Sequence, residues 1–311
     1  MTNLGRGNRA LRGGRHWLQA VGLSLMLALS PNWAIAQQGF DSETGEAVSS
    51  LALSAAFVQG GAPVHANLHW RVFRARARDD GSHPLVAESK LSAPQLSLPP
   101  GNYIVHVAYG LASAMGNVEL GSSAQQMELY LKAGALDIKC VVGDSEIDAS
   151  HVDLSIYASE PRNLQAKLVM AHARAGSLIG LPEGNYDVVS TYLDHSGLGG
   201  VKDAQGVPSN SVVSASLSVQ VGKITEATLR HRFATVTMKL VNKPGGEALA
   251  NTSFAILTPG GDPIRDLIGA FPAVVLAEGE YDAIARNNGK TYEGTFKVDS
   301  NINRDVEIIA K

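Results

Sequence analysis

Two short stretches contain residue types that could do chemistry. Asp194-His-Ser holds the three residue types of a nucleophilic triad. A triad needs partners on different elements that face one another, whereas these three side chains are adjacent in one glycine-rich stretch. Asp144-x-Glu-x-Asp148 has the spacing of the first three ligands of a calcium loop. Such a loop requires glycine and glutamate where this chain has Ala149 and Ser155, so neither stretch predicts a catalytic or metal site.

Cofactor motifs are equally incomplete. Gly197-x-Gly-Gly follows an expected strand, but no helix opens after it, which excludes a phosphate-binding loop. The nine histidines are scattered, with no pair at metal-ligand spacing on one strand face. We therefore expect no enzymatic activity, no cofactor and no metal. An active site assembled from separate loops would leave no local motif, so that alternative stays open.

One cluster of charge stands out, formed by Arg71, Arg74, Arg76 and Arg78. Arginines at alternate positions of a strand share one face, so the last three are expected to point together toward solvent. The simpler interpretation is a solvated face that protects an edge strand from pairing. The alternative is a ligand-binding patch for an anionic envelope polymer such as a phosphorylated glycan.

The elements that position these residues are organised around a repeated hexapeptide. It occurs as Leu98-Pro-Pro-Gly-Asn-Tyr103, Leu181-Pro-Glu-Gly-Asn-Tyr186 and Leu276-Ala-Glu-Gly-Glu-Tyr281. Three copies of one turn and strand start indicate three copies of one small domain. We predict a type II turn in each copy, because glycine supplies the positive φ of its second central position. The residues of this structural turn are Gly101, Tyr103, Gly184, Tyr186, Gly279 and Tyr281.

Alternation of apolar and polar residues in short segments, separated by Gly/Pro turns, predicts an all-β fold. We expect three tandem immunoglobulin-like or prealbumin-like β-sandwich domains. The expected segments are a signal peptide at 1–36, a disordered leader at 37–50, and sandwiches at 51–134, 135–232 and 233–311. The joints Lys132-Ala-Gly and Arg230-His-Arg are too short to act as flexible tethers.

Several local features refine this prediction. The segment from Asn67 to Arg78 is expected to be one strand, with a change of phase that predicts a β-bulge at Val72-Phe73. Cys140 lies on the apolar side of its alternation and is expected to be a buried structural thiol. The second copy contains an insertion, Asp194 to Ser211, whose role the sequence leaves open.

The first 36 residues carry an export signal. Four arginines precede an apolar run from Trp17 to Leu29, and Ala34-Ile-Ala36 supplies a small-x-small cleavage site. Cleavage after Ala36 predicts a periplasmic or secreted protein with no stable membrane insertion afterwards. Loss of four arginines takes the net charge from −3 to about −7, which argues against nucleic acid as a partner.

The Leu-Pro-x-Gly-x-Tyr turn that enters a strand resembles the one in carboxypeptidase-regulatory-like and collagen-adhesin B-type (prealbumin-like) repeats, over residues 51–311. The resemblance implies sandwiches of about seven strands in exported proteins, used as stalks, spacers or binding modules. The whole chain is also similar to exported repeat proteins of alphaproteobacteria, which imply no activity. Some B-type repeats form Lys–Asn isopeptide bonds, but no matching pair is predicted here.

Together these features favour a non-enzymatic exported cell-envelope protein, a tandem β-sandwich spacer or interaction module. The alternative is a module that binds glycan or an anionic polymer through the arginine strand or the Asp194–Ser211 insertion. Trp70 is expected in a core, so it offers no stacking platform for a sugar. An envelope protein or a glycan is the expected partner, and the oligomeric state is left open.

Overall fold

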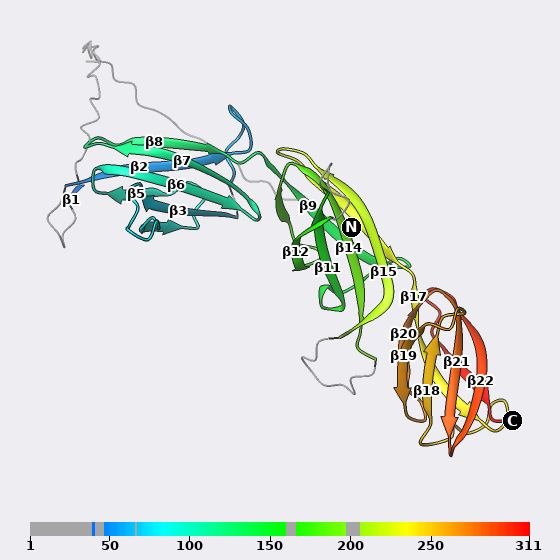
Figure 1. Cartoon of the computed structure of the whole chain (residues 1–311). Helices are drawn as coiled ribbons and strands as arrows, with labels where there is room; N and C mark the ends of the chain where they lie inside the picture. Colours follow the sequence, from blue (N-terminus) through cyan, green and yellow to red (C-terminus); the bar gives the residue numbers. More distant parts are fainter. Residues whose placement is uncertain (1–38, 41–46, 66, 160–165, 197–205) are drawn as a thin grey trace, which may run out of the picture. The chain divides into compact units, whose positions relative to one another are not determined.

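The computed structural model describes residues 39–40, 47–65, 67–159, 166–196 and 206–311 (Figure 1). In these ranges the regular structure is β, apart from one 3-10 turn, η1 (Ala149–His151). The strands form six sheets, two for each of three consecutive sandwiches, which confirms the predicted all-β class. No helix in the described ranges has the length and apolar character needed to cross a membrane.

Each sandwich pairs the sheet that holds its first and last strands with a second, four-stranded sheet. In the first sandwich the first sheet contains β1 (Gly39–Phe40), β2 (Ala47–Ala56), β5 (Gln95–Leu98) and β8 (Gln125–Tyr130). The second sheet has the order β4 (Leu85–Ser89), β3 (Leu68–Arg74), β6 (Gly101–Tyr109) and β7 (Ala112–Leu120).

The second sandwich repeats this arrangement. Its first sheet contains β10 (Ser145–Glu146), β9 (Ala133–Val142), β13 (Ile179–Pro182) and β16 (Ile224–His231). Its second sheet has the order β12 (Lys167–Ala173), β11 (Val152–Ala158), β14 (Gly184–Asp194) and β15 (Val207–Val219).

The third sandwich follows the same plan. Its first sheet has the order β20 (Ala273–Ala277), β17 (Phe233–Val241) and β23 (Arg304–Ile309). Its second sheet has the order β19 (Pro263–Ile268), β18 (Ser253–Leu257), β21 (Gly279–Asn287) and β22 (Lys290–Val298). In all three sandwiches the first long strand pairs in parallel with the last, as β2 with β8, β9 with β16 and β17 with β23.

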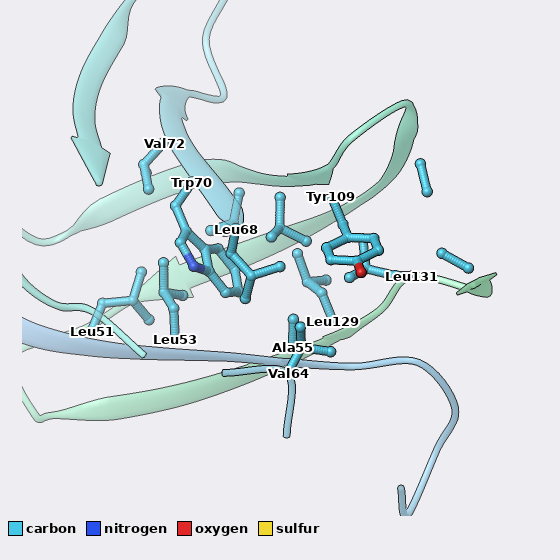
Figure 2. Close-up of a cluster of buried hydrophobic side chains, with 14 of the residues drawn as sticks. Leu51, Leu53, Ala55, Val64, Leu68, Trp70, Val72, Tyr109, Leu129 and Leu131 are labelled. Atoms are coloured by element: carbon cyan, nitrogen blue, oxygen red, sulfur yellow. The ribbon is translucent and has the colours of Figure 1, made fainter. Parts of the chain in front are cut away.

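Each sandwich encloses its own cluster of buried apolar side chains. Figure 2 shows the first cluster, in which the Trp70 ring lies among leucine and valine side chains and is fully buried. The second cluster includes Cys140, and burial raises the pKa of its thiol. Trp70 and Cys140 therefore serve packing, as their alternation predicts, because apolar surface removed from water stabilises each sandwich.

The repeated hexapeptide forms a corner between two sheets, and the predicted type II turn is wrong in all three copies. A type II turn needs φ near +80° at its glycine. Gly101 has φ 157°, and Gly184 and Gly279 do not have positive φ. Each glycine instead begins the strand that enters the second sheet.

A tyrosine hydroxyl closes each corner. Tyr103 donates to the Pro99 carbonyl at 2.6 Å and Tyr186 to the Pro182 carbonyl at 2.9 Å. Tyr281 donates to the Ala277 carbonyl at 2.7 Å. In each copy the acceptor lies four residues before the tyrosine, the arrangement of a tyrosine corner. The three tyrosines therefore occupy equivalent environments, as expected for three copies of one unit.

The strand that carries the arginines is shorter than predicted. The expected bulge at Val72-Phe73 is confirmed, since the register of β3 against β4 shifts there. The strand ends at Arg74 rather than Arg78. Beyond it the Arg78 N–H donates to the Ser82 carbonyl at 2.8 Å, and the Asp80 carboxylate accepts the Ser82 N–H at 2.8 Å. These bonds replace the sheet ladder with a local turn.

The predicted disordered leader, 37–50, is wrong for its described residues. Strand β2 begins at Ala47, and β1 pairs with it through Gly39↔Val48. Ser49 is buried, and its hydroxyl donates to the Ser123 carbonyl at 2.7 Å. Polar composition suggested a leader, but residues 47–50 pair with β1 and β5, which satisfies their backbone groups within the sheet. The predicted signal peptide, 1–36, lies outside the described residues.

Candidate functional site

The junction between the second and third sandwiches contains a buried carboxylate. Asp194 ends β14 and is 6% exposed. One of its oxygens accepts the Val275 backbone N–H of β20 at 2.9 Å. The other accepts the Ser196 N–H at 2.8 Å and the Ser196 hydroxyl at 2.6 Å. A buried charge is costly unless it is hydrogen-bonded, and these three donors meet that need.

Asn210, on β15, makes the second polar link across this junction. Its side-chain oxygen accepts the Ala277 N–H at 2.9 Å, and its side-chain nitrogen donates to the Tyr281 hydroxyl at 2.9 Å. The corner tyrosine of the third sandwich is thus part of the junction. Because β20 is an edge strand, its N–H groups would otherwise lack partners; Asp194 and Asn210 supply them.

A histidine lies buried beside the same junction. His231, at the end of β16, is fully buried; its Nε2 hydrogen-bonds the Ser190 hydroxyl at 2.8 Å and its Nδ1 the Ser211 hydroxyl at 2.9 Å. Burial lowers the pKa of His231, which keeps the imidazole neutral at pH 7. Serine and histidine at this distance are also parts of hydrolases.

The burial of this group argues against catalysis. Ser190 is 0% exposed and Ser211 is 3% exposed, so a substrate cannot reach either hydroxyl. The Ser190 hydroxyl also lies 3.4 Å from the Cys140 sulfur. Within the described residues this is a satisfied polar network inside a core, which fixes how β9, β14, β15 and β16 pack.

An equivalent backbone hydrogen bond occurs at both junctions, the one between the first and second sandwiches and the one between the second and third. The Glu183 N–H, in the second corner, donates to the Lys132 carbonyl at 3.1 Å. The Glu278 N–H, in the third corner, donates to the Arg232 carbonyl at 2.9 Å. In both cases the acceptor belongs to the joint that precedes the sandwich. Arg232 and Glu278 are further joined by two side-chain hydrogen bonds of 2.8 Å.

At the junction between the first and second sandwiches, the backbone at Gly110 and Leu111 lies close to the backbone at Gly180. The Leu111 N–H donates to the Gly180 carbonyl at 2.9 Å. A Cβ atom added to Gly110 would lie 2.3 Å from the Gly180 oxygen, and one added to Gly180 would lie 2.5 Å from the Tyr109 ring. Gly110 also has φ 57°. Glycine is therefore needed at both positions, for space at Gly180 and for space and conformation at Gly110.

Three of the four arginines of the predicted patch line one hollow, and Arg71 is not among the residues that line it. Arg71 lies on β3 beside Glu88, with its Nε 3.8 Å from a carboxylate oxygen. The Arg74 guanidinium lies over the Tyr103 ring, 4.9 Å from its centre. Arg76 and Arg78 follow the strand and are exposed. With Arg74 they line an open hollow that also contains Asp79, Asp80, Pro84 and Asn102.

The acidic stretch and the histidines do not converge on a metal. No group of three or more His, Cys, Asp or Glu side chains in the described part of the chain is arranged to hold an ion. Asp148 instead accepts the Ser150 N–H at 2.8 Å and caps η1.

Sequence reasoning missed the role of the insertion's two ends. Asp194 and Asn210 were expected at most to line a glycan-binding loop, yet both bind the third sandwich. The only available signal was the presence of two hydrogen-bonding residues at the ends of a segment found in one copy alone. Residues 197–205, between them, lie outside the described residues.

Fold and junctions together define a tandem β-sandwich repeat protein. Residues 235–310, the third sandwich, match the model of the Rhizobiales growth-associated tandem repeat domain. This match agrees with the resemblance to alphaproteobacterial repeat proteins. No protein with a curated description matches the chain.

The chain is also similar, at low sequence identity, to several solved structures. The Bacillus anthracis TIE protein is 17% identical over 85% of this chain, with a TM-score of 0.26, and the chain spans 50% of its length. The Streptococcal ancillary pilin is 12% identical, over 85% of this chain and 99% of its own, with a TM-score of 0.28. A putative adhesin from Bacteroides ovatus is 12% identical, over 53% of this chain and 75% of its own, with a TM-score of 0.33.

Proposed function

We propose that this protein is a non-enzymatic component of the cell envelope, exported by its N-terminal segment, in which three tandem sandwiches act as a spacer and interaction module. The observation that supports this most is the hydrogen bond that the Val275 N–H donates to the Asp194 carboxylate. A spacer must hold neighbouring units at a fixed separation. A buried contact whose polar groups are all hydrogen-bonded limits bending between the second and third sandwiches. Export to the periplasm or the outside rests on the signal predicted at 1–36.

Distance measurement tests the spacer function directly. Spin labels on cysteines replacing the exposed Lys167 and Lys290 report the separation of the second and third sandwiches. Buried Cys140 stays unlabelled. We expect a narrow distance distribution that broadens when Asp194 and Asn210 are both changed to alanine. A broad distribution in the otherwise unaltered protein would contradict the spacer function.

Cell fractionation tests the proposed export to the cell envelope or the medium. The protein, tagged at its C-terminus in its native host, is expected in the envelope or the medium, with an N-terminus at Gln37. Uncleaved protein confined to the cytosol would rule out the exported role. Crosslinking before fractionation would identify the envelope component it contacts.

A second candidate function is binding of an anionic envelope polymer. Two exposed arginines, Arg76 and Arg78, line the same hollow, and neither forms an ion pair among the described residues. Asp79 and Asp80 in the same lining weaken the local positive potential, which makes this the weaker proposal.

Replacing Arg76 and Arg78 with serine, while keeping Arg74 in place over Tyr103, tests the polymer hypothesis. Retention on isolated envelopes should fall and should depend on salt, because screening weakens exposed charge interactions. Arg286→Ser, an exposed arginine on β21, is the control. Retention that is unchanged and insensitive to salt would exclude this polymer-binding function.

A further inference from the structure

Three equivalent edge strands, β7, β15 and β22, pair on one side only among the described strands. Their equivalence is fixed by register, since Gly101, Gly184 and Gly279 lie opposite Leu120, Val219 and Val298. The side chains that point away from the core differ between the copies. They are Ser113, Met115, Asn117 and Glu119 in β7, Val212, Ser214, Ser216 and Ser218 in β15, and Thr291, Glu293, Thr295 and Lys297 in β22.

Proteins usually protect open edges with charges or bulges. The opposite edges of the same sheets have bulges, because the pairing of β4, β12 and β19 with their neighbours is shifted in each case. Strand β22 carries Glu293 and Lys297 at its outward positions. Strand β15 has no charged residue along its 13 positions, and its register with β14 is regular from Val212 to Val219.

The first residues of β15 already contact the third sandwich. Pro208 accepts a hydrogen bond from Arg265 at 2.9 Å, and Asn210 binds β20, so the start of the strand contacts the third sandwich. Residues 212–217 pair with another described strand on one side only, whereas the Ser218 carbonyl also accepts the Thr225 hydroxyl at 2.8 Å. Their inward residues Val213, Ala215 and Leu217 are only partly buried at the margin of the core. A neighbouring strand would cover these side chains and satisfy the unpaired backbone groups.

We propose that this neighbour is β15 of a second copy of the chain, paired antiparallel about a twofold axis at Ala215. The strand is complementary to itself in this register. Val213 lies opposite Leu217 of the partner on the core side, and Ser214 lies opposite Ser216 on the outer side. No like charges meet, which is a condition for such an isologous pair. The pairing adds an assembly to the proposed spacer and does not depend on that function.

Mass measurement tests the assembly. Light scattering on the full chain, produced in an exporting host, is expected to show twice the monomer mass as concentration rises. Changing Ser214 and Ser216 to lysine places four cations around the axis and should return the mass to that of one chain. Changing Met115 and Asn117 of β7 to lysine is the matched control and should leave the dimer intact. Circular dichroism verifies that both variants are folded.

Disulfide trapping tests the register. Directly opposed residues have Cα atoms about 4.5–5.5 Å apart, within the range that a disulfide bridges. Ser214→Cys combined with Ser216→Cys should form a covalent dimer on oxidation, whereas Ser214→Cys combined with Ser218→Cys should not. A monomer at every concentration overturns the proposal. So does a dimer that the β7 lysines dissociate and the β15 lysines do not.

Discussion

The Asp194 carboxylate accepts the Val275 backbone N–H at 2.9 Å, and so joins two sandwiches through residues 81 positions apart in the chain. The contact is made at the end of β14, where Asp194 reaches the edge strand β20. Protection of the Val275 amide therefore reports whether this bond is intact.

Asp194→Ala should expose the Val275 N–H. Loss of a hydrogen bond to a charged group costs about 1.5–3 kcal/mol, which predicts exchange of that amide at least tenfold faster if opening of the junction controls exchange. Hydrogen exchange by NMR measures it. Asp194→Asn retains an oxygen acceptor and should have a smaller effect. Equal protection of Val275 in all three proteins would show that the bond does not hold the junction.

Tyr281→Phe should destabilise the protein more than Tyr186→Phe does. Both changes remove a bond to a backbone carbonyl, worth about 1 kcal/mol, but Tyr281 also accepts a bond from Asn210. Urea unfolding followed by fluorescence or exchange in each sandwich makes the comparison. A larger loss in the Tyr186 variant would mean that the Asn210 bond contributes nothing.

Acidification should destabilise the second sandwich through His231. Burial lowers the pKa of His231 in the folded state, so the unfolded chain binds more protons below its ordinary pKa of about 6.5. The stability that neutral His231 contributes is present above pH 6.5 and is lost as the pH falls through the folded pKa.

The comparison with His231→Gln isolates this contribution, because glutamine retains hydrogen-bonding atoms and does not titrate. The difference in unfolding free energy between the two proteins should shrink between pH 7 and pH 5. A difference independent of pH would mean that His231 does not titrate on unfolding in this range.

Cys140 should not react with a thiol reagent in the native protein. Cys140 is 1% exposed and burial raises the pKa of its thiol, so both access and the thiolate fraction are low. Reaction with Ellman's reagent is expected only in urea, at the rate at which the second sandwich opens. Rapid native labelling would contradict the buried position.

Gly180→Ala should loosen the first junction. Its Cβ would lie 2.5 Å from the Tyr109 ring, and such overpacking costs about 1–3 kcal/mol. Gly121→Ala is the matched control, because no atom lies within 4 Å of the position its Cβ would take. If both changes lowered the melting temperature equally, the loss of stability would come from replacing a glycine as such and not from the clash with Tyr109 at the junction.

The sequence predicted those structural features whose residue pattern lies within one short segment. Alternation around Trp70 predicted its burial, a phase change predicted the bulge at Val72-Phe73, and the repeated hexapeptide predicted three equivalent tyrosines. The turn type was wrong because the Tyr side chain, not the glycine conformation, closes the corner. A pattern of residue types does not distinguish these two causes.

The junction could not be predicted in the same way. Asn210 and its partner Ala277 lie 67 positions apart, and nothing in the local pattern of either residue indicates the other. The strand that carries the arginines was predicted to end at Arg78, but it ends at Arg74 because Asp80 and Ser82 form a turn that competes with the sheet. Contacts between distant segments need the fold before they can be identified.

The parallel pairing of the first and last strands in each sandwich has a mechanical consequence. A pulling force applied at the two ends of such a unit acts along both strands in opposite directions. The hydrogen bonds between β9 and β16, or between β17 and β23, then bear the load together and must break together. Each unit is therefore built to resist tension by shear, which is the loading that a chain stretched between two anchored surfaces would experience.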